Sequence, residues 1–296
     1  MSATAAQRWA QARSFHHSPY SAQRIAHERR HTVSVCLPAR ECADTVGEIV
    51  TALVALRDVG AIDEIAVIDA ASADRTADVA ERAGATVWQE AQLLPAYGPV
   101  LGKGDAMWRA LSVLDGELVC FLDADTQRFS AHFATGLLGP LVCEPGVSFV
   151  KGFYRRPFGE GGEGGGRVNH LAARPALALF YPELAGVRQP LAGEVAARRE
   201  LLEGLSFATG YGVEIAMLID VWRELGLDGI AQVDLDEHHN RHQPLSALAP
   251  MALTVLATIA RRLSQEGRLV DARGVAAADL ELAPLERPPL ARVSVA

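Results

Sequence analysis

The feature that most constrains this chain is the apolar run Leu118-Val-Cys-Phe-Leu122, which is followed at once by Asp123-Ala-Asp125. Five apolar residues in succession are typical of a strand that is buried on both faces of a mostly parallel sheet. Because side chains at positions i and i+2 of a strand point the same way, both carboxylates leave its C-terminal end toward one place. Open α/β sheets bind ligands at that edge, and two carboxylates so close together repel unless a proton or a cation lies between them. A lone Asp-x-Asp can equally be an acidic turn, so its meaning depends on the rest of the chain.

Apolar runs alternate with helical patterns along the first half of the chain. We expect strands at 32–37, 64–69 and 85–88, with the first strand stopped by Pro38. The apolar spacing over 46–56 predicts a helix between the first two strands. This alternation predicts an α/β fold with a doubly wound, mostly parallel, Rossmann-like sheet, right-handed crossovers and helices on both faces.

The second half changes character and is expected to be mainly helical. A strand at 147–150 precedes the segment 158–169, which is too rich in glycine to hold a regular element. Further expectations are a broken helical region at 171–205, an amphipathic helix at 211–225, a short strand at 232–235 and a long helix at 245–263. The tail after Gly267 is expected to be partly loose. We therefore divide the chain into an N-terminal arm (1–30), a nucleotide-binding half (31–150), an acceptor-binding half (151–245) and a C-terminal helix with its tail (246–296).

Composition excludes several classes of protein. The chain has 296 residues, of which 49% are hydrophobic and 22% charged, as in a globular protein, and its net charge of −8 argues against nucleic acid or an anionic membrane as partner. No apolar run is long enough to span a bilayer, and residues 1–30 contain no apolar signal core. The four cysteines lack Cys-x-x-Cys spacing, so we expect reduced thiols and a cytoplasmic protein.

Two segments are suited to binding anions. Gly102-Lys-Gly104 places Lys103 at the start of an expected helix, where backbone N–H groups and the helix dipole attract negative charge. The spacing of a P-loop is absent, and a solvated helix start is the alternative. The second segment ends in Gly166-Arg-Val-Asn169 and lies downstream of Lys151, Arg155 and Arg156. Glycines let N–H groups face a ligand and arginine grips phosphate or carboxylate with two hydrogen bonds, although a flexible linker is the alternative.

Two loops and a histidine cluster complete the candidate site. The loops that follow the first two strands carry Glu41 and Ser72 and lie at the same edge as the two aspartates, although ordinary turns would look alike. His238, His239 and His242 crowd one short segment. A zinc site would need three or four ordered ligands, whereas one imidazole can join Asp125 around Mg²⁺ or Mn²⁺; inert surface histidines are the alternative.

Taken together, these segments resemble the GT-A glycosyltransferases and, within that group, the actinobacterial glucosyl-3-phosphoglycerate synthases. The resemblance runs from about Val33 to Arg262. The Asp-x-Asp is shared by many sugar-nucleotide enzymes, whereas the glycine loop and the Pro-Leu-Ala-Gly-Glu run are far more selective. The resemblance rests on Val35-Cys-Leu-Pro-Ala39, Val67-Ile-Asp69, Gly102-Lys-Gly104, Asp123-Ala-Asp125, Gly164-Gly-Gly-Arg-Val168, Tyr181-Pro-Glu-Leu-Ala-Gly186, Gln189-Pro-Leu-Ala-Gly-Glu194, Thr209-Gly-Tyr211 with Glu214, and Gln232-Val-Asp-Leu235.

The resemblance implies a GT-A fold and a retaining enzyme. It would move glucose from UDP-glucose to the 2-hydroxyl of 3-phosphoglycerate, with Mg²⁺ or Mn²⁺ as cofactor. We also expect a homodimer, because the helix after Leu245 is rich in small apolar residues. By resemblance, the donor is bound by Pro38, Ala39, Glu41, Ser72, Lys103, Asp123 and Ala124; the catalytic residues are Asp123, Asp125, Glu214 and Lys103; the acceptor is bound by Gly166, Arg167, Val168, Asn169 and Asn240; and the metal is held by Asp125 and His242.

This chain departs from the family pattern at two places. Asn169 stands where the family usually has Thr, which changes the reach of a hydrogen bond to the acceptor. The family's His-Arg-Asn corresponds most simply to Asn240-Arg241-His242, which favours His242 as the metal ligand; an alignment shifted by two residues favours His238 instead.

Three other functions are considered. A mannosyltransferase would use GDP-mannose with the same acceptor. A sugar-1-phosphate nucleotidyltransferase would need a glycine- and arginine-rich loop after the first strand, and Leu37-Pro-Ala-Arg-Glu41 is not such a loop. A non-catalytic nucleotide-sugar sensor would bind UDP-glucose without consuming it, and the intact Asp-x-Asp and Arg167 loop argue against it.

Overall fold

The computed structural model describes residues 4–158, 162–163, 165–240, 243–269 and 285–293. Eight strands form one sheet in the order β1-β11-β6-β9-β5-β2-β3-β4. Neighbouring strands are parallel except at β9, which is antiparallel to both β5 and β6. The strands are β1 (Ser14–His16), β2 (Val33–Ala39), β3 (Glu64–Asp69), β4 (Thr86–Gln89), β5 (Leu118–Phe121), β6 (Phe149–Arg155), β9 (Val195–Arg198) and β11 (Ile230–Glu237).

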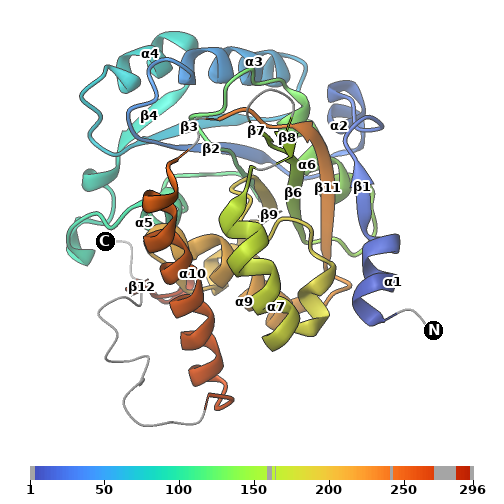
Figure 1. Ribbon diagram of the computed structural model, residues 1–296. Helices are drawn as coiled ribbons and strands as arrows, with labels where there is room; N and C mark the ends of the chain where they lie inside the picture. The colour runs from blue at the N-terminus through green and yellow to red at the C-terminus, as the bar shows by residue number, and fades with distance from the viewer. Residues whose placement is uncertain (1–3, 159–161, 164, 241–242, 270–284, 294–296) are drawn as a thin grey trace.

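Helices cover both faces of this sheet, and each face has its own hydrophobic core (Figure 1). The core on one face is closed by α2 (Ala22–Glu28), α3 (Val46–Asp58), α4 (Thr76–Ala83) and α6 (His132–Cys143). The core on the other face is closed by α1 (Ala5–Ala12), α5 (Lys103–Ala110), α7 (Arg174–Phe180), α8 (Arg199–Gly204), α9 (Val213–Leu225) and α10 (Leu245–Gln265). Along β5, Val119 and Phe121 enter one core and Leu118 and Cys120 enter the other, as expected for a strand buried on both faces. The predicted α/β class with a mostly parallel sheet is confirmed.

Shorter elements connect these layers. Two small antiparallel pairs are formed by β7 (Pro157–Phe158) with β8 (Gly162–Glu163) and by β10 (Phe207–Ala208) with β12 (Glu286–Arg287). The remaining short helices are η1 (Glu90–Gln92), η2 (Pro95–Tyr97), η3 (Asn169–Ala173), η4 (Pro182–Gly186), η5 (Gly210–Gly212) and η6 (Leu290–Arg292).

The first strand is longer than predicted, because β2 continues through Pro38 to Ala39. The carbonyl of Ala39 accepts a hydrogen bond from Ala70 beside β3, so the nitrogen of Pro38 faces the other neighbour, β5. That neighbour has already ended at Phe121, so the missing N–H of the proline interrupts no ladder.

Two predictions for the remaining segments are wrong, and the N-terminal arm also contributes β1 to the edge of the sheet. Strand β9 lies within the region 171–205 that was expected to be helical. The short β7–β8 pair occurs within the glycine-rich segment that was expected to lack regular structure. Both β1 and β9 have only three or four residues, so their periodicity is weak, and pairing with distant strands decides their conformation.

The long C-terminal helix is confirmed and runs as α10 to Gln265. Among the described helices, α10 alone has the length and apolar composition that a membrane span needs, whereas no apolar run of that length was expected from the sequence. The core helix of a soluble protein can have the same length and composition. Its Arg262 is buried and donates to Asp220 of α9, which fixes the helix to the rest of the protein. The described end of the tail is also packed, since β12 pairs with β10 and Leu290 is buried.

Candidate active site

A cavity of about 550 Å³ lies beyond the C-terminal ends of β2 and β5. Such an edge is the usual ligand site of an open α/β sheet. Its walls include six residues that the sequence assigned to the donor or the metal, namely Pro38, Ala39, Lys103, Asp123, Ala124 and Asp125. These residues come from three separate segments, and the fold brings them together around one cavity.

Two predicted donor residues, Glu41 and Ser72, do not line this cavity. The backbone N–H of Glu41 donates to Ser72 Oγ at 2.9 Å, and Glu41 Oε1 accepts from the N–H of Ala73 at 2.9 Å. The two loops are therefore joined to each other beside the cavity, while Arg40 and Cys42 form its wall. A direct role for Glu41 and Ser72 in binding the donor stays a prediction.

Lys103 is the centre of the charged wall of the cavity. Its Nζ lies 2.5 Å from Asp123 Oδ1 and 3.0 Å from Glu214 Oε1, so α5, the end of β5 and α9 meet at one ammonium group. Burial by itself would lower the pKa of Lys103, but Asp123 and Glu214 outweigh it and raise that pKa well above its usual value. The lysine therefore carries a permanent positive charge.

Glycines on both sides of Lys103 make this position possible. Gly102 begins α5 with a φ of 91°, a conformation that favours glycine. A Cβ on Gly104 would lie 1.9 Å from the carbonyl oxygen of Ala208, so no other residue fits there. The Gly-Lys-Gly sequence thus lets the helix start approach Ala208 closely while Lys103 faces the cavity.

Asp125 provides an oxygen ligand suited to a divalent cation. It lines the cavity, and among the described residues it makes no hydrogen bond or ion pair. The carboxylate faces the cavity, and partial desolvation by the surrounding walls, followed by the nearby charge of Asp123, raises the pKa of Asp125. A cation at this carboxylate would relieve both effects, and carboxylate oxygens are the ligands that Mg²⁺ and Mn²⁺ prefer.

His238 occupies a buried position next to the two aspartates. Its Nε2 lies 2.9 Å from Glu194 Oε1 and 3.1 Å from Thr126 Oγ1, and its ring stacks on Tyr154 with centroids 4.5 Å apart. Ligand atoms of Asp123, Glu194 and His238 lie within 4.8 Å of one another, so this group could also contact a cation. The preferred metal ligand of the sequence analysis, His242, lies outside the described residues.

Glu194 is a site residue that the sequence analysis did not assign. It is buried, and its pKa is lowered in spite of that burial because His238, Arg156 and Tyr154 stabilise the carboxylate. The sequence feature that could have identified Glu194 is the Pro-Leu-Ala-Gly-Glu run. Only the antiparallel pairing of β9 with β5 and β6, however, brings this glutamate beside His238.

A second cavity, of about 170 Å³, lies on the side of the glycine-rich loop. Its walls include all five predicted acceptor residues, Gly166, Arg167, Val168, Asn169 and Asn240. Sequence reasoning left out Gln189, which also lines it. The grouping of the Arg167 loop with Asn240 is as predicted.

Asn169 is buried, and its side chain forms hydrogen bonds with backbone groups. Its Nδ2 donates to the carbonyl of Arg188 at 3.3 Å, and its Oδ1 accepts from the N–H of Leu191 at 3.4 Å. The residue therefore fixes the glycine-rich loop against 188–191. These two hydrogen bonds explain how Asn can replace the Thr of the family pattern without leaving a buried polar group unsatisfied.

The turn 189–194 separates the two cavities. Ala192 lines the second cavity, whereas a Cβ on the next residue, Gly193, would lie 2.4 Å from both Lys103 Nζ and Asp123 Oδ1. Lys151 lies beneath this turn and donates to the carbonyl of Ala192 at 2.8 Å; burial lowers its pKa to about 8. Lys151 thus supports the turn and lines neither cavity.

The comparisons with known proteins agree with this geometry. Residues 34–189, over half of the chain, match the model of glycosyl transferase family 2. The chain is therefore a glycosyltransferase of this family. It is 47% identical over 235 residues to the glucosyl-3-phosphoglycerate synthase of Mycolicibacterium smegmatis, which covers 78% of this chain and 77% of that relative.

Solved structures narrow the class further. The crystal structure of glucosyl-3-phosphoglycerate synthase from Mycobacterium tuberculosis in complex with Mn²⁺, UDP-glucose and phosphoglyceric acid is 39% identical, has a TM-score of 0.82, and covers 94% of this chain and 98% of that one. Mannosyl-3-phosphoglycerate synthase from Rubrobacter xylanophilus is 45% identical, with a TM-score of 0.90 and coverage of 97% and 99%. The chain belongs to the glucosyl-3-phosphoglycerate synthase family, which confirms the predicted resemblance and the GT-A fold.

Proposed function

We propose that this enzyme transfers glucose from UDP-glucose to the 2-hydroxyl of 3-phosphoglycerate with retention of the anomeric configuration. The observation that carries this proposal is the pair of cavities on either side of the turn 189–194. The larger has the charge pattern of a diphosphate site, and the smaller has the arginine and glycine N–H groups of a phosphate site. A sugar that reaches past Gly193 would meet an acceptor held by Arg167.

Lys103 and the start of α5 stabilise the leaving diphosphate. The charge of Lys103 is permanent, and Gly102 and Lys103 at the start of α5 line the same cavity, at the positive end of the helix dipole. Asp125 would hold the divalent metal together with a histidine of the segment 238–242, and the bound metal supplies Lewis-acid stabilisation of the diphosphate. Asp123 is the ion-pair partner that keeps Lys103 in place.

The second cavity positions the acceptor. Arg167 and the glycine-rich loop bind the phosphate and carboxylate of 3-phosphoglycerate, and Asn240 completes this wall. Holding the hydroxyl next to the anomeric carbon converts a bimolecular step into an effectively unimolecular one.

Retention does not require a protein nucleophile in this site. Asp123 and Glu214 are both ion-paired with Lys103, an arrangement suited to positioning the donor rather than to forming a covalent glycosyl intermediate. We therefore assign a same-face attack in which the leaving phosphate receives the proton of the acceptor hydroxyl.

Mannosyl transfer from GDP-mannose to the same acceptor is the second candidate, because of the similarity to the Rubrobacter xylanophilus enzyme. A competition experiment separates the two. The enzyme is given equal concentrations of both donors with 3-phosphoglycerate and Mn²⁺, and the product is identified by NMR. We expect an α-glucosyl product; a mainly mannosyl product would replace the donor assignment, and a β-linkage would refute retention.

We also propose that the enzyme is a homodimer located in the cytoplasm. Exposed leucines gather on α7 and α10, which lie side by side in Figure 1, and they include Leu179, Leu253 and Leu256. The four cysteines are free, which suits a reducing compartment. In analytical ultracentrifugation Leu179→Glu should convert a dimer into a monomer; a monomeric unmodified protein would contradict the proposed homodimer.

A further inference from the structure

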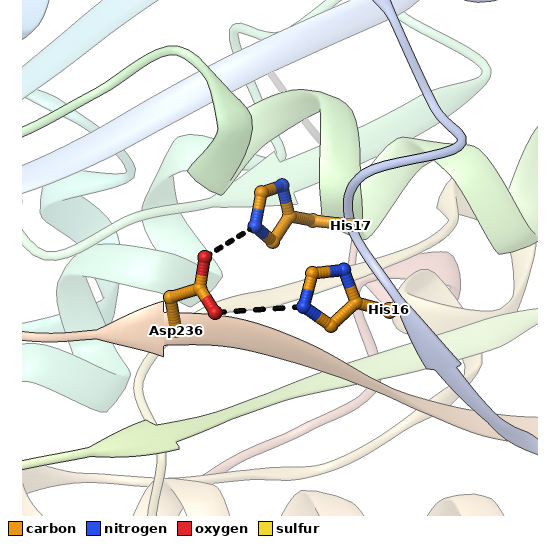
Figure 2. A group of neighbouring side chains, drawn as sticks. All are labelled: His16, His17 and Asp236. Atoms are coloured by element: carbon orange, nitrogen blue, oxygen red, sulfur yellow. Dashed lines mark hydrogen bonds and ion pairs between the residues drawn. The ribbon is translucent and has the colours of Figure 1, made fainter.

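Two imidazoles and a carboxylate converge at the edge of the sheet, away from both cavities. His16 ends β1, His17 follows it, and Asp236 lies in β11 (Figure 2). His17 Nε2 lies 2.7 Å from Asp236 Oδ2, and His16 Nε2 lies 3.4 Å from Oδ1. Ligand atoms of all three residues lie within 4.8 Å of one another. We propose that His16, His17 and Asp236 form a second metal site, which binds a transition-metal cation of the Zn²⁺ class and ties the N-terminal strand to β11.

The backbone is arranged to bring these groups together. Strand β1 pairs in parallel with β11, and the N–H of His17 donates to the carbonyl of Asp234 at 3.1 Å. The pairing of β11 with β6 shifts register between Asp234 and Glu237, and Asp236 within this bulge has a φ of 63°. A bulge re-aims a side chain, and here the carboxylate of Asp236 is directed toward the two histidines.

The packing behind His17 holds its ring in position. The ring of His132 lies against it with centroids 4.2 Å apart, and the Nε2 of His132 bonds to the carbonyl of Leu235 at 3.0 Å. Gly136 of α6 leaves room, because a Cβ there would lie 2.8 Å from the Cβ of His17.

The donor set selects the type of cation. Two imidazoles with one carboxylate are ligands for Zn²⁺ and related ions, whereas Mg²⁺ prefers oxygen ligands alone. Bonds of about 2.0–2.2 Å in a tetrahedron place ligand atoms roughly 3.4 Å apart. The distance from His16 Nε2 to Asp236 Oδ1 already has this value, whereas the distance from His17 Nε2 to Asp236 Oδ2 would lengthen by about 0.7 Å.

The proposed site leaves room for a water ligand and for the ring proton of His16. The side chains of His16 and Asp236 are 49% and 51% exposed, so water can fill the fourth position. Without a cation the N–H of Ser18 donates to Nδ1 of His16 at 3.1 Å, which leaves the ring proton on Nε2 toward Asp236. When a cation takes Nε2, that proton moves to Nδ1, where Ser18 Oγ at 3.0 Å can accept it as an outer-shell partner.

Zinc binding to the chelator-treated full chain tests this site without any readout of activity. All proteins carry Asp125→Asn, which weakens the metal site of the donor cavity, and no nucleotide is added. A chromophoric chelator reports Zn²⁺ uptake, and Co²⁺ gives a visible spectrum that reports tetrahedral ligands. We expect one Zn²⁺ per chain, with affinity reduced at least about 100-fold by either His17→Gln or Asp236→Asn.

A matched control separates this cluster from any exposed histidine–carboxylate pair. His31 lies 3.1 Å from Glu117 on another part of the surface, and His31→Gln should bind Zn²⁺ like the parent protein. Hydrogen exchange should slow in residues 14–17 and 232–236 only when Zn²⁺ is added to a chain that retains all three ligands. The proposal is refuted if the parent binds no Zn²⁺, or if His17→Gln and Asp236→Asn, folded by circular dichroism, bind it equally well.

Discussion

Gly193→Ala should damage the reaction centre while leaving the fold intact. Gly193 lacks a positive φ, so its backbone accepts alanine, but the new Cβ would lie 2.4 Å from Lys103 Nζ and Asp123 Oδ1. An ordinary contact needs at least 3.4 Å, so the ion pair must move by about 1 Å. A displacement of about 1 Å in a catalytic group can reduce the rate about 100-fold, which corresponds to about 2.7 kcal/mol in activation free energy. We therefore expect kcat to fall about 100-fold.

The assay is the initial rate of UDP release at saturating substrates, with the midpoint of thermal unfolding measured on the same samples. Gly204→Ala is the matched control, because no heavy atom lies within 4 Å of its added Cβ and its φ is not positive. The control should keep normal turnover. A rate within threefold of the unmodified enzyme for Gly193→Ala, or equal losses in both variants, would refute the assigned importance of the Lys103–Asp123 geometry.

Three further predictions concern charged side chains. Asp125→Ala and Lys103→Ala should each lower the rate of UDP release at least about 100-fold, and near-normal rates would contradict their assigned roles. Burial, and then the neighbouring Asp105, raise the pKa of Glu90 to about 7. The folded state therefore binds more protons than the unfolded state between about pH 4.5 and 7, and stability falls as the pH rises through that window. Glu90→Gln should be more stable than the unmodified protein at pH 8, on the order of 3 kcal/mol in urea unfolding, with a much smaller difference at pH 5; equal differences would refute this. Arg287 donates to the buried Asp105 at 2.6 and 2.9 Å, so Arg287→Ala should lower the free energy of unfolding by about 3–5 kcal/mol, and a loss below about 1 kcal/mol would contradict it.

The donor side of the site was predictable from the sequence for a physical reason. Parallel strands end at a common edge, so residues just after two apolar runs must lie near one another wherever the chain is doubly wound. Asp123, Asp125 and Pro38 follow this rule. Lys103 was predicted because a lysine at an expected helix start adds a full charge to backbone N–H groups that already attract anions.

The parts that were missed depend on contacts between distant segments. Glu194 meets His238 only because β9 inserts antiparallel between β5 and β6, and a four-residue strand of small side chains leaves almost no periodic signal. Lys151 lines neither cavity because its strand runs beneath the turn at Ala192. The loop of Glu41 lies at the predicted edge, and its side chain accepts a hydrogen bond from the neighbouring loop.

Acceptor-dependent release of nucleotide tests the central claim most directly. Enzyme, UDP-glucose and Mn²⁺ are incubated with and without 3-phosphoglycerate, and free UDP is measured over time. The account predicts UDP release only when the acceptor is present, with one glucosyl-3-phosphoglycerate formed per UDP. Release at the same rate without the acceptor, or no release with it under conditions where UDP-glucose binds, would contradict the account.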